Sequence, residues 1–402
     1  MKVVITGVGA VSGFGWGVEE LCRGLESGAT SIRTPSVFDV EGQRTTLAAE
    51  VGPPDADAQM EIDHLRNLSR ADIFAVIAAR EALVRAGLEG GGPRTGVFCG
   101  GSTAGMAECE DFVGRIVGVR PGKPMLKLLA SQQLNGPGDA VARDIGACGP
   151  VVGFSSACAS GAMALGAALQ AVRSGEVDVA LAGGADSLCL LTYSGFNALR
   201  SVDPGACQPF RKDRQGLSLG EGAGMLVLES LDQAVARGAE PLAELAGYGA
   251  SCDAHHMTAP HPEGDGALAA MQAALKDAGL EGIDIDAVNA HGTGTAHNDQ
   301  SESCALRRLL GDRSPEVPLT APKGALGHVL GAAGALEAVA SVVALERGAV
   351  FPTAGSAPAD SDLHIDLVLE NPRQLPPTSQ TWISTNFAFG GANAALVVRR
   401  LV

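Results

Sequence analysis

The sequence predicts an α/β protein built from two parts, and three observations lead to that prediction. The chain has 402 residues, more than one hydrophobic core usually holds, so two domains or half-domains are expected. Apolar residues make up 46% of the chain and charged residues 18%, which is typical of a large folded protein and not of a disordered chain. Strand-like and helix-like segments alternate along the sequence, as they do in α/β folds.

The expected strands are short apolar runs bounded by glycine or polar residues. They are KVVITGVG (2–9), TGVFCGG (95–101), VDVALAGGADS (177–187), GMLVLES (224–230), AVNAHGTG (287–294) and AALVVRRL (394–401). The expected helices are longer, and each ends in or near glycine, a frequent residue at helix C-termini. They cover residues 71–87, 159–175, 266–279 and 331–348.

A coarse two-fold rhythm runs through these elements. In the first half, an apolar run leads to Cys158, to a small-residue helix and to another strand. In the second half, residues 318–345 again give an irregular stretch followed by a small-residue helix. We place the boundary near residues 230–250, which gives an N-terminal half of residues 1–240 and a C-terminal half of residues 241–402.

Charge, cysteine usage and hydropathy argue against several classes of function. A formal net charge of −16 argues against general nucleic-acid binding, which needs a basic surface. The nine cysteines are spread singly, without CxxC pairs or Cys/His clusters at zinc spacing, so we expect a reducing cytoplasm and no metal site. The N-terminus lacks the features of a signal peptide, and no apolar run reaches about 18 residues, so no membrane segment is expected.

Cys158 stands where an apolar run, VVGFS, gives way to a helix of small residues. If the helix begins at or just after this residue, free backbone N–H groups and the helix dipole favour a thiolate there. The small side chains allow the helix to pack deep inside the protein. Although a buried cysteine is commonly only a small apolar residue, this position favours a nucleophile.

Three further motifs carry polar or aromatic side chains at strand or helix ends. The stretch NAHGTGT (289–295) presents His291, and Thr293 and Thr295 offer hydroxyls. KGALGH runs from Lys323 to His328 before a Gly/Ala-rich helix. NFAFGGAN (386–393) places aromatic residues beside a double glycine, where a free backbone N–H suits an oxyanion hole.

One cysteine, two histidines, one lysine and a Phe-Gly-Gly loop, in this order, resemble the β-ketoacyl-acyl-carrier-protein synthases. These belong to the thiolase superfamily, and the resemblance is to the elongating class (type I/II) with a Cys-His-His site. It covers nearly the whole chain and includes PFRKDRQGLSLGEGAGMLVLE (209–229) and SCDAHHMTAP (251–260). It implies a thiolase-like α/β fold, with two similar halves in five αβαβα layers, and a dimer.

The resemblance also implies a reaction, a decarboxylative Claisen condensation between two carrier-bound thioesters. Cys158 would take the acyl group, while the backbone N–H groups of Cys158 and Phe389 hold the oxyanion. His291 and His328 would donate to the malonyl thioester carbonyl. The route needs no metal and no cofactor, because the phosphopantetheine arrives on the acyl carrier protein.

Other site residues follow from the same resemblance. Lys323 would support the second histidine and pair with Glu302. A second set would contact the phosphopantetheine arm: Thr293, Thr295 and Thr258. An acidic carrier also needs a basic entrance on this negative protein, for which HLRNLSRAD offers Arg66 and Arg70, and a second basic cluster lies at Arg211, Lys212 and Arg214.

This chain departs from the family pattern in its gate, the segment Phe387-Ala388-Phe389. The family usually has glycine where Ala388 stands, and alanine reaches positive φ less freely, so we expect a stiffer acyl gate. Gly324 and Ala392 also replace a common serine and a common threonine. These changes bear on the substrate and not on the reaction.

Three functions remain open from the sequence. The first is a ketosynthase of fatty-acid elongation. The second is a ketosynthase of a type II polyketide or aryl-polyene pathway, paired with a chain-length-factor subunit; the polar run MAECED (106–111), with Glu108, favours it slightly. The third is a non-catalytic partner subunit, which the presence of Cys158, His291 and His328 opposes. A thiolase is disfavoured because no cysteine follows Cys304.

Overall fold

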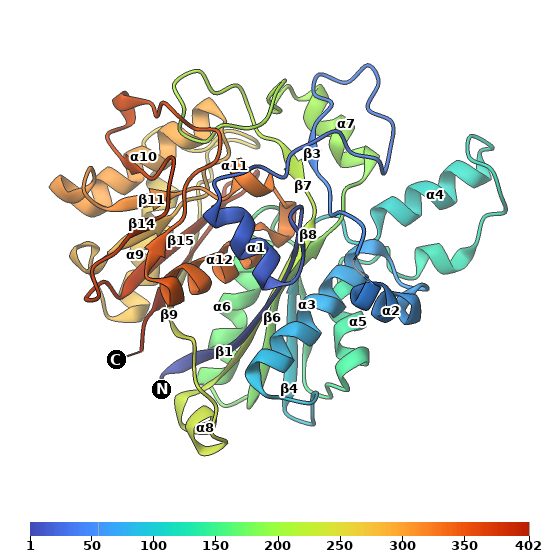
Figure 1. Ribbon diagram of the computed structural model, residues 1–402, viewed down its shortest axis with the longest axis horizontal. Helices are drawn as coiled ribbons and strands as arrows, with labels where there is room; N and C mark the ends of the chain where they lie inside the picture. Colours follow the sequence, from blue (N-terminus) through green and yellow to red (C-terminus); the bar gives the residue numbers. More distant parts are fainter. Residues whose placement is uncertain (55, 402) are drawn as a thin grey trace.

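One mixed β-sheet crosses the molecule in the computed structural model, which describes residues 1–54 and 56–401 (Figure 1). Its strand order is β13-β11-β10-β15-β16-β9-β1-β8-β6-β4-β5, and β2 pairs with β1. The strands of the N-terminal part are β1 (Val3–Ser12), β2 (Gly15–Trp16), β4 (Thr95–Gly100), β5 (Val151–Phe154), β6 (Val179–Asp186) and β8 (Gly222–Ser230). Those of the C-terminal part are β9 (Ala243–Cys252), β10 (Ala287–Asn289), β11 (Pro318–Thr320), β13 (Asp366–Leu367), β15 (Thr381–Phe387) and β16 (Ala392–Arg399).

The two parts of the sheet repeat one topology. In the first, β5, β4 and β6 are parallel, and β8 and β1 continue the sheet antiparallel. In the second, β11, β10 and β15 are parallel, and β16 and β9 continue it antiparallel. A short antiparallel pairing between β1 and β9 joins the two parts. The predicted two-fold rhythm is therefore present in the strand order, while the division at residue 240 stays a prediction.

Helices complete the five layers. Helix α3 (Arg70–Ala86) covers the outer face of the first part of the sheet, and α9 (Asp265–Ala278) covers that of the second. Between the two parts lie α6 (Ser160–Arg173) and α12 (Ala333–Arg347), which contact strands of both (Figure 1). The buried apolar residues accordingly form one large central cluster and one cluster under each outer layer. The expected thiolase-like α/β fold is confirmed.

The remaining helices and strands connect or flank these layers. The helices are α1 (Val18–Glu26), α2 (Ala56–Leu65), α4 (Met106–Ile116), α5 (Gly136–Ile145), α7 (Leu190–Ala198), α8 (Leu231–Ala236), α10 (Ala296–Leu310) and α11 (Lys323–Leu326). Two small sheets pair β3 (Ala48–Ala49) with β7 (Leu219–Gly220) and β12 (Ala349–Val350) with β14 (Arg373–Gln374). Within the described residues, no helix has the length and apolar character needed to cross a membrane.

Small residues let the two central helices touch backbone to backbone. A Cβ added at Gly161 would lie 2.9 Å from the backbone nitrogen of Ala335, and one added at Gly334 would lie 2.8 Å from the Cβ of Ala162. Such distances are shorter than real Cβ atoms tolerate, so larger side chains would force α6 and α12 apart. The Ala/Gly-rich sequence after Cys158 thus serves close packing in the central layer.

Candidate active site

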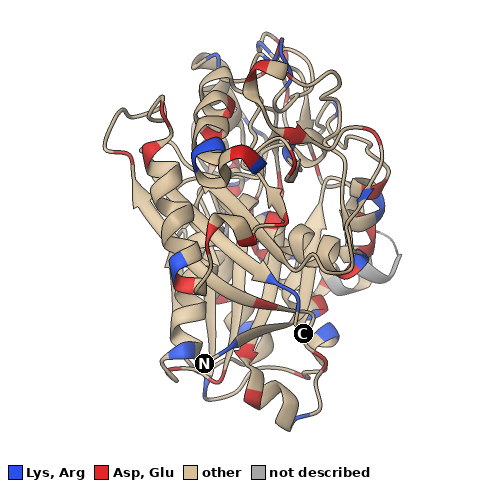
Figure 2. Cartoon of the chain, turned by 90° about the vertical axis from the view of Figure 1, so that its left-hand side faces the viewer, with Lys and Arg blue, Asp and Glu red and all other residues tan. Residues whose placement is uncertain are grey.

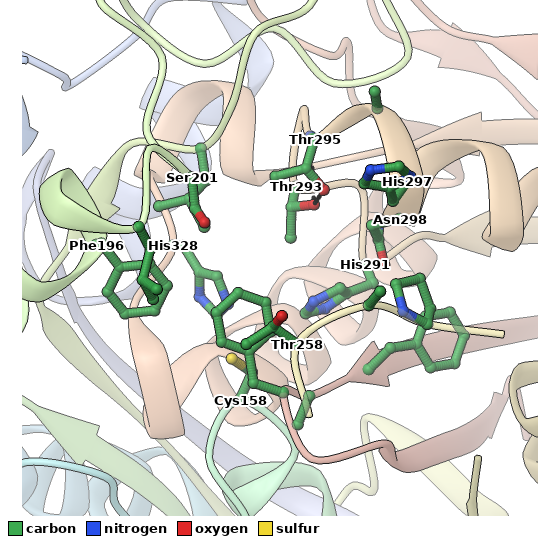
Figure 3. A pocket seen from close by; sticks show the side chains of 18 of the residues that line it. Cys158, Phe196, Ser201, Thr258, His291, Thr293, Thr295, His297, Asn298 and His328 are labelled. Carbon is green, nitrogen blue, oxygen red and sulfur yellow. Dashed lines mark hydrogen bonds between the residues drawn. The ribbon is translucent and has the colours of Figure 1, made fainter. Parts of the chain in front are cut away.

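Cys158 lies in the turn between β5 and α6, two residues before the helix begins. The residue before it, Ala157, has a positive φ of 47°, which turns the chain sharply. Ser160 fastens this turn, because its hydroxyl accepts a hydrogen bond from the Ser156 N–H (2.8 Å) and donates one to the Ala157 carbonyl (2.6 Å). The helix start therefore presents one sulfur at a fixed place, and Figure 3 shows it on the floor of a cavity.

Burial favours the protonated form of the Cys158 thiol. Burial raises its pKa to about 11, while the Lys323 charge and the backbone N–H groups of Phe389 and Cys158 lower it by less. Desolvation thus outweighs the preference for a thiolate that we expected from the helix end. The two N–H groups that face the sulfur are those expected to form the oxyanion hole.

The two histidines lie beside each other above this sulfur (Figure 3). His291 follows β10 and His328 follows α11, and their ring centroids are 5.4 Å apart at an interplanar angle of 86°. Both side chains are buried, and burial together with the Lys323 charge holds both pKa values well below the usual range. Both imidazoles are therefore neutral.

Hydrogen bonds to the Nδ1 atoms determine where each neutral ring carries its proton. The Leu330 N–H donates to Nδ1 of His328 (3.1 Å), and Leu330 adopts a positive φ of 50° beside it. Lys323 Nζ lies 3.1 Å from Nδ1 of His291, and an ammonium group only donates. In both rings Nδ1 accepts, so Nε2 carries the hydrogen. The pair presents two N–H donors of the kind that stabilises a developing oxyanion.

Lys323 is anchored by a carboxylate that the sequence analysis did not identify. Its ammonium group forms a buried ion pair with Glu337 on α12, and Glu337 also accepts a hydrogen bond from the Asn386 side chain (2.6 Å). The predicted pairing of Lys323 with Glu302 is wrong, because its ion-pair partner is Glu337 and it also contacts Nδ1 of His291; its support of the second histidine, His328, stays a prediction. The sequence did contain a signal for the pairing with Glu337, a single acidic residue in the apolar helix GALEAVASVVAL, because a buried charge requires a partner of opposite charge.

Glu302 instead fixes the loop that carries His291. Its carboxylate accepts hydrogen bonds from the backbone N–H groups of His291 (2.8 Å) and Gly292 (2.9 Å) and from the Thr385 hydroxyl (2.7 Å). Burial raises its pKa to about 7. Glu302 is thus a positioning residue, because its three hydrogen bonds hold the backbone that carries the His291 imidazole.

A cavity of about 520 Å³ connects this buried floor to an exposed rim. Thr293 and Thr295 line it, and their hydroxyls lie 2.9 Å apart. Thr258 also lines the cavity and lies in an exposed loop, where its N–H donates to His256 Nδ1 (3.1 Å). All three threonines therefore line the same cavity as Cys158, while their contact with a phosphopantetheine arm stays a prediction.

The gate segment closes one side of the cavity. Phe387 ends β15 with its ring centroid 5.7 Å from that of His291, and the Phe389 ring stacks on Phe196 of α7 at 5.6 Å. The positive φ values in this turn belong to Gly390 (87°) and Gly391 (80°) and not to Ala388. In this conformation the alanine therefore costs no backbone strain, and a stiffer gate stays a prediction.

The two arginines expected at the carrier entrance differ in their surroundings. Arg66 directly follows the last residue of α2 and is exposed. Arg70 instead donates to the buried carboxylate of Glu221, with Nη2–Oε1 at 2.5 Å, and its guanidinium stacks over Phe74. Arg70 therefore holds the fold together, and of the two predicted residues Arg66 is the one that presents its charge at the surface.

The other polar residues singled out in the sequence also have partners. Arg214 lines the cavity but is bound to Asp360 (3.0 Å), and the exposed Lys212 faces Asp362 at 3.8 Å. Glu108 accepts a hydrogen bond from the backbone N–H of Arg70 (2.8 Å), at the start of α3. Glu108 thus caps a helix and does not line the cavity around Cys158.

Comparisons with known proteins agree with this geometry. The family described as "Beta-ketoacyl synthase, N-terminal domain" matches residues 1–234, and the "Beta-ketoacyl synthase, C-terminal domain" matches residues 242–356. Nodulation protein E of Rhizobium meliloti (strain 1021) is 37% identical, with 100% of this chain and 99% of that protein covered. The 3-oxoacyl-[acyl-carrier-protein] synthase 2 of Staphylococcus aureus (strain MRSA252) is 35% identical, with 100% and 98% covered. The solved "ishigamide ketosynthase/chain length factor" matches with a TM-score of 0.92, 38% identity and 100% and 99% coverage.

Proposed function

This chain belongs to the β-ketoacyl synthase family, and on that premise we propose that Cys158, His291 and His328 carry out a decarboxylative Claisen condensation on acyl-carrier-bound thioesters. The observation that carries the proposal is one cavity holding a single sulfur between two backbone N–H groups and two neutral imidazoles with Nε2–H donors. A nucleophile and a separate set of oxyanion donors are what a two-step acyl transfer and condensation requires.

In the first step Cys158 becomes acylated. Its sulfur attacks the carbonyl carbon of the acyl thioester, a C–S bond forms, and the carbonyl electrons move to oxygen, where the N–H groups of Cys158 and Phe389 bind them. When the oxyanion collapses, the bond to the carrier sulfur breaks. The proton of the Cys158 thiol ends on that sulfur, so the carrier leaves as a thiol.

In the second step a malonyl thioester enters along the threonine-lined side of the cavity. Its thioester oxygen accepts from Nε2–H of His291 and His328, so that the electrons released when the C–CO₂ bond breaks are held as an enolate. The enolate carbon attacks the acyl carbonyl on Cys158, and a C–C bond forms as the C–S bond breaks. The sulfur takes up one proton, and the product is two carbons longer.

Partners follow from the family and from the surface. An acyl carrier protein delivers both substrates, and a second ketosynthase-fold chain covers the edge strand β5, where Val152 is exposed. The apolar residues Val113 and Ile116 on α4 are also exposed. We place the reaction in the cytoplasm. Figure 2 shows Lys and Arg positions interspersed with Asp and Glu positions along the chain, and the formal net charge of −16 disfavours nucleic acid as a partner.

Intact-mass analysis tests the proposed reaction. The purified chain is incubated with malonyl carrier protein and a panel of acyl carrier starters. We expect an acyl adduct on the peptide that contains Cys158 and carrier products extended by two carbons. Absence of both the adduct and the extension with every starter would overturn the proposal.

A second candidate is the same chemistry in a type II polyketide or aryl-polyene pathway with a non-identical partner. It is favoured by the likeness to a solved ketosynthase/chain length factor over the full chain. Co-expression with a homologous chain that lacks the cysteine tests it. A stable heterodimer that makes longer products than the isolated chain supports this candidate, and a homodimer with unchanged products contradicts it.

A further inference from the structure

We propose that Glu110, on helix α4, is a positioning residue that holds α7 and, through α7, the acyl gate beside Cys158. The proposal rests on the proposed function, because the gate matters only when Cys158 carries an acyl group. Glu110 lies outside the cavity and touches none of the reacting atoms. Its effect would therefore reach the site through the structure it supports.

Helix α7 lacks a capping group of its own. Its N-cap residue, Cys189, makes no capping hydrogen bond to the backbone, and its first turn contains no acidic residue. The carboxylate of Glu110 supplies both missing elements, since it accepts from the backbone N–H of Leu190 (3.1 Å) and of Leu191 (2.6 Å). A negative charge bound to free N–H groups at the positive end of a helix stabilises it.

Helix α7 is connected to the nucleophile through one aromatic contact. One and a half turns after the capped end, Phe196 stacks on Phe389, with ring centroids 5.6 Å apart and an interplanar angle of 25°. The backbone N–H of Phe389 in turn faces the Cys158 sulfur. A shift of α7 would thus displace the aromatic wall of the acyl site and one of the two oxyanion donors.

The support comes from an arm that stands away from the body of the protein. In Figure 1, α4 and the chain after it project to one side, and within α4 only Gly114 is buried. Two of its carboxylates bind the starts of other helices: Glu108 accepts from the first N–H of α3, and Glu110 accepts from the first two of α7. The arm therefore fixes the start of α7 by charge and hydrogen bonds, while the buried Tyr193 and Asn197 tie the rest of the helix to Thr45.

The hydrogen bonds that hold the two histidines come from other elements. His291 is held by Lys323, and His328 by the Leu330 N–H; neither contact involves α4 or α7. Loss of Glu110 should consequently slow acylation of Cys158 and leave malonyl decarboxylation unchanged. A general loss of stability would lower both rates together.

The test compares Glu110→Ala and Glu110→Gln with the wild-type chain. We expect Glu110→Ala to slow acylation about tenfold to a hundredfold, since displacements near 1 Å at a reacting centre have effects of this size. Glu110→Gln should lose about threefold to tenfold, because its amide oxygen accepts only one of the two bonds and carries no charge. The rate of CO₂ release from malonyl carrier protein should stay within about twofold of wild type.

Asp111→Asn is the matched control, because Asp111 is the next residue on α4 and, among the residues that the structure describes, its ion pairs are with Arg115 and Arg120. It should leave both rates unchanged. Unchanged acylation in both Glu110 variants, or an equal fall of acylation and decarboxylation in Glu110→Gln, would overturn the inference. A wild-type chain that neither acylates nor decarboxylates would instead overturn the proposed function itself.

Discussion

Helices α6 and α12 lie side by side in the central layer, and each begins next to a group of the site. The region before α6 presents Cys158 mainly through its backbone, with a positive φ at Ala157 and two N–H groups at the sulfur, and the uncharged Ser160 hydroxyl fastens the turn. The region before α12 presents His328, and α12 itself contributes Glu337, which anchors the lysine behind His291. One region relies on chain geometry and the other on buried charges.

This difference indicates how each region should respond to change. Backbone N–H groups remain when side chains are replaced, so the oxyanion hole near Cys158 should survive most substitutions nearby. A buried ion pair is cooperative, because removing one member leaves the other charge without solvent or partner. In the nucleophile region, activity should therefore be most sensitive to replacement of the Cys158 sulfur. In the histidine region, activity and stability should be most sensitive to loss of the buried ion pair.

The largest expected effect is the loss of the sulfur. Cys158→Ala should abolish condensation, by at least about a thousandfold, because no other group can carry the acyl chain. Malonyl decarboxylation should persist, since His291 and His328 keep their hydrogen bonds. Intact-mass analysis and CO₂ release measure the two steps, and an acyl adduct on the variant chain would contradict the comparison.

The ion pair gives the next effect. Glu337→Leu alone leaves the Lys323 ammonium buried and unpaired, which should cost about 3–5 kcal/mol in the free energy of unfolding. The double variant Lys323→Met/Glu337→Leu should regain much of that stability but lose about a hundredfold in decarboxylation, because His291 loses its Nδ1 donor. Urea unfolding and CO₂ release measure these quantities. Equal stability of Glu337→Leu and wild type would show that the pair is not cooperative.

The rate at which the free Cys158 thiol is alkylated should increase about tenfold for each pH unit. Because burial raises the Cys158 pKa from 9.0 to about 11, the protonated form prevails below that value, and the thiolate fraction grows about tenfold for each pH unit from 7 to 10. Alkylation by iodoacetamide, followed by mass spectrometry of the Cys158 peptide, should rise accordingly. The exposed Cys148 serves as a control for access in the same sample. A plateau near pH 8 would show that the site stabilises the thiolate.

The smallest effect concerns the surface. Arg66→Glu should raise KM for the carrier-bound acyl substrate several-fold and leave kcat unchanged, because exposed charges mainly affect encounter with a charged partner. The change in KM should shrink at high salt. Arg70 is unsuitable for this comparison since its replacement would leave Glu221 buried without its ion pair. An unchanged KM at low salt would exclude Arg66 from carrier docking.

The family, the α/β class and the principal groups of the cavity could all be predicted from the amino-acid sequence. These lie in local motifs: small residues around Cys158, histidines beside glycine turns, and strand–helix alternation. Cys158, His291, His328, Thr293 and Phe389 were all named from such motifs, and the structure brings them to one cavity. Local patterns suffice here because each motif lies at the end of a regular element, and the fold brings those ends together.

The partners of the charged side chains could be identified only from the three-dimensional structure. Lys323 binds Glu337 and not Glu302, because α12 lies behind His291 while Glu302 faces the backbone of the following loop. Arg70 faces a buried carboxylate, and Glu110 caps a helix 80 residues away in the chain. The protonation of Cys158 also depends on burial, which arises only when both halves close over it. Pairings and desolvation are long-range properties, and they arise only where separate segments of the chain meet.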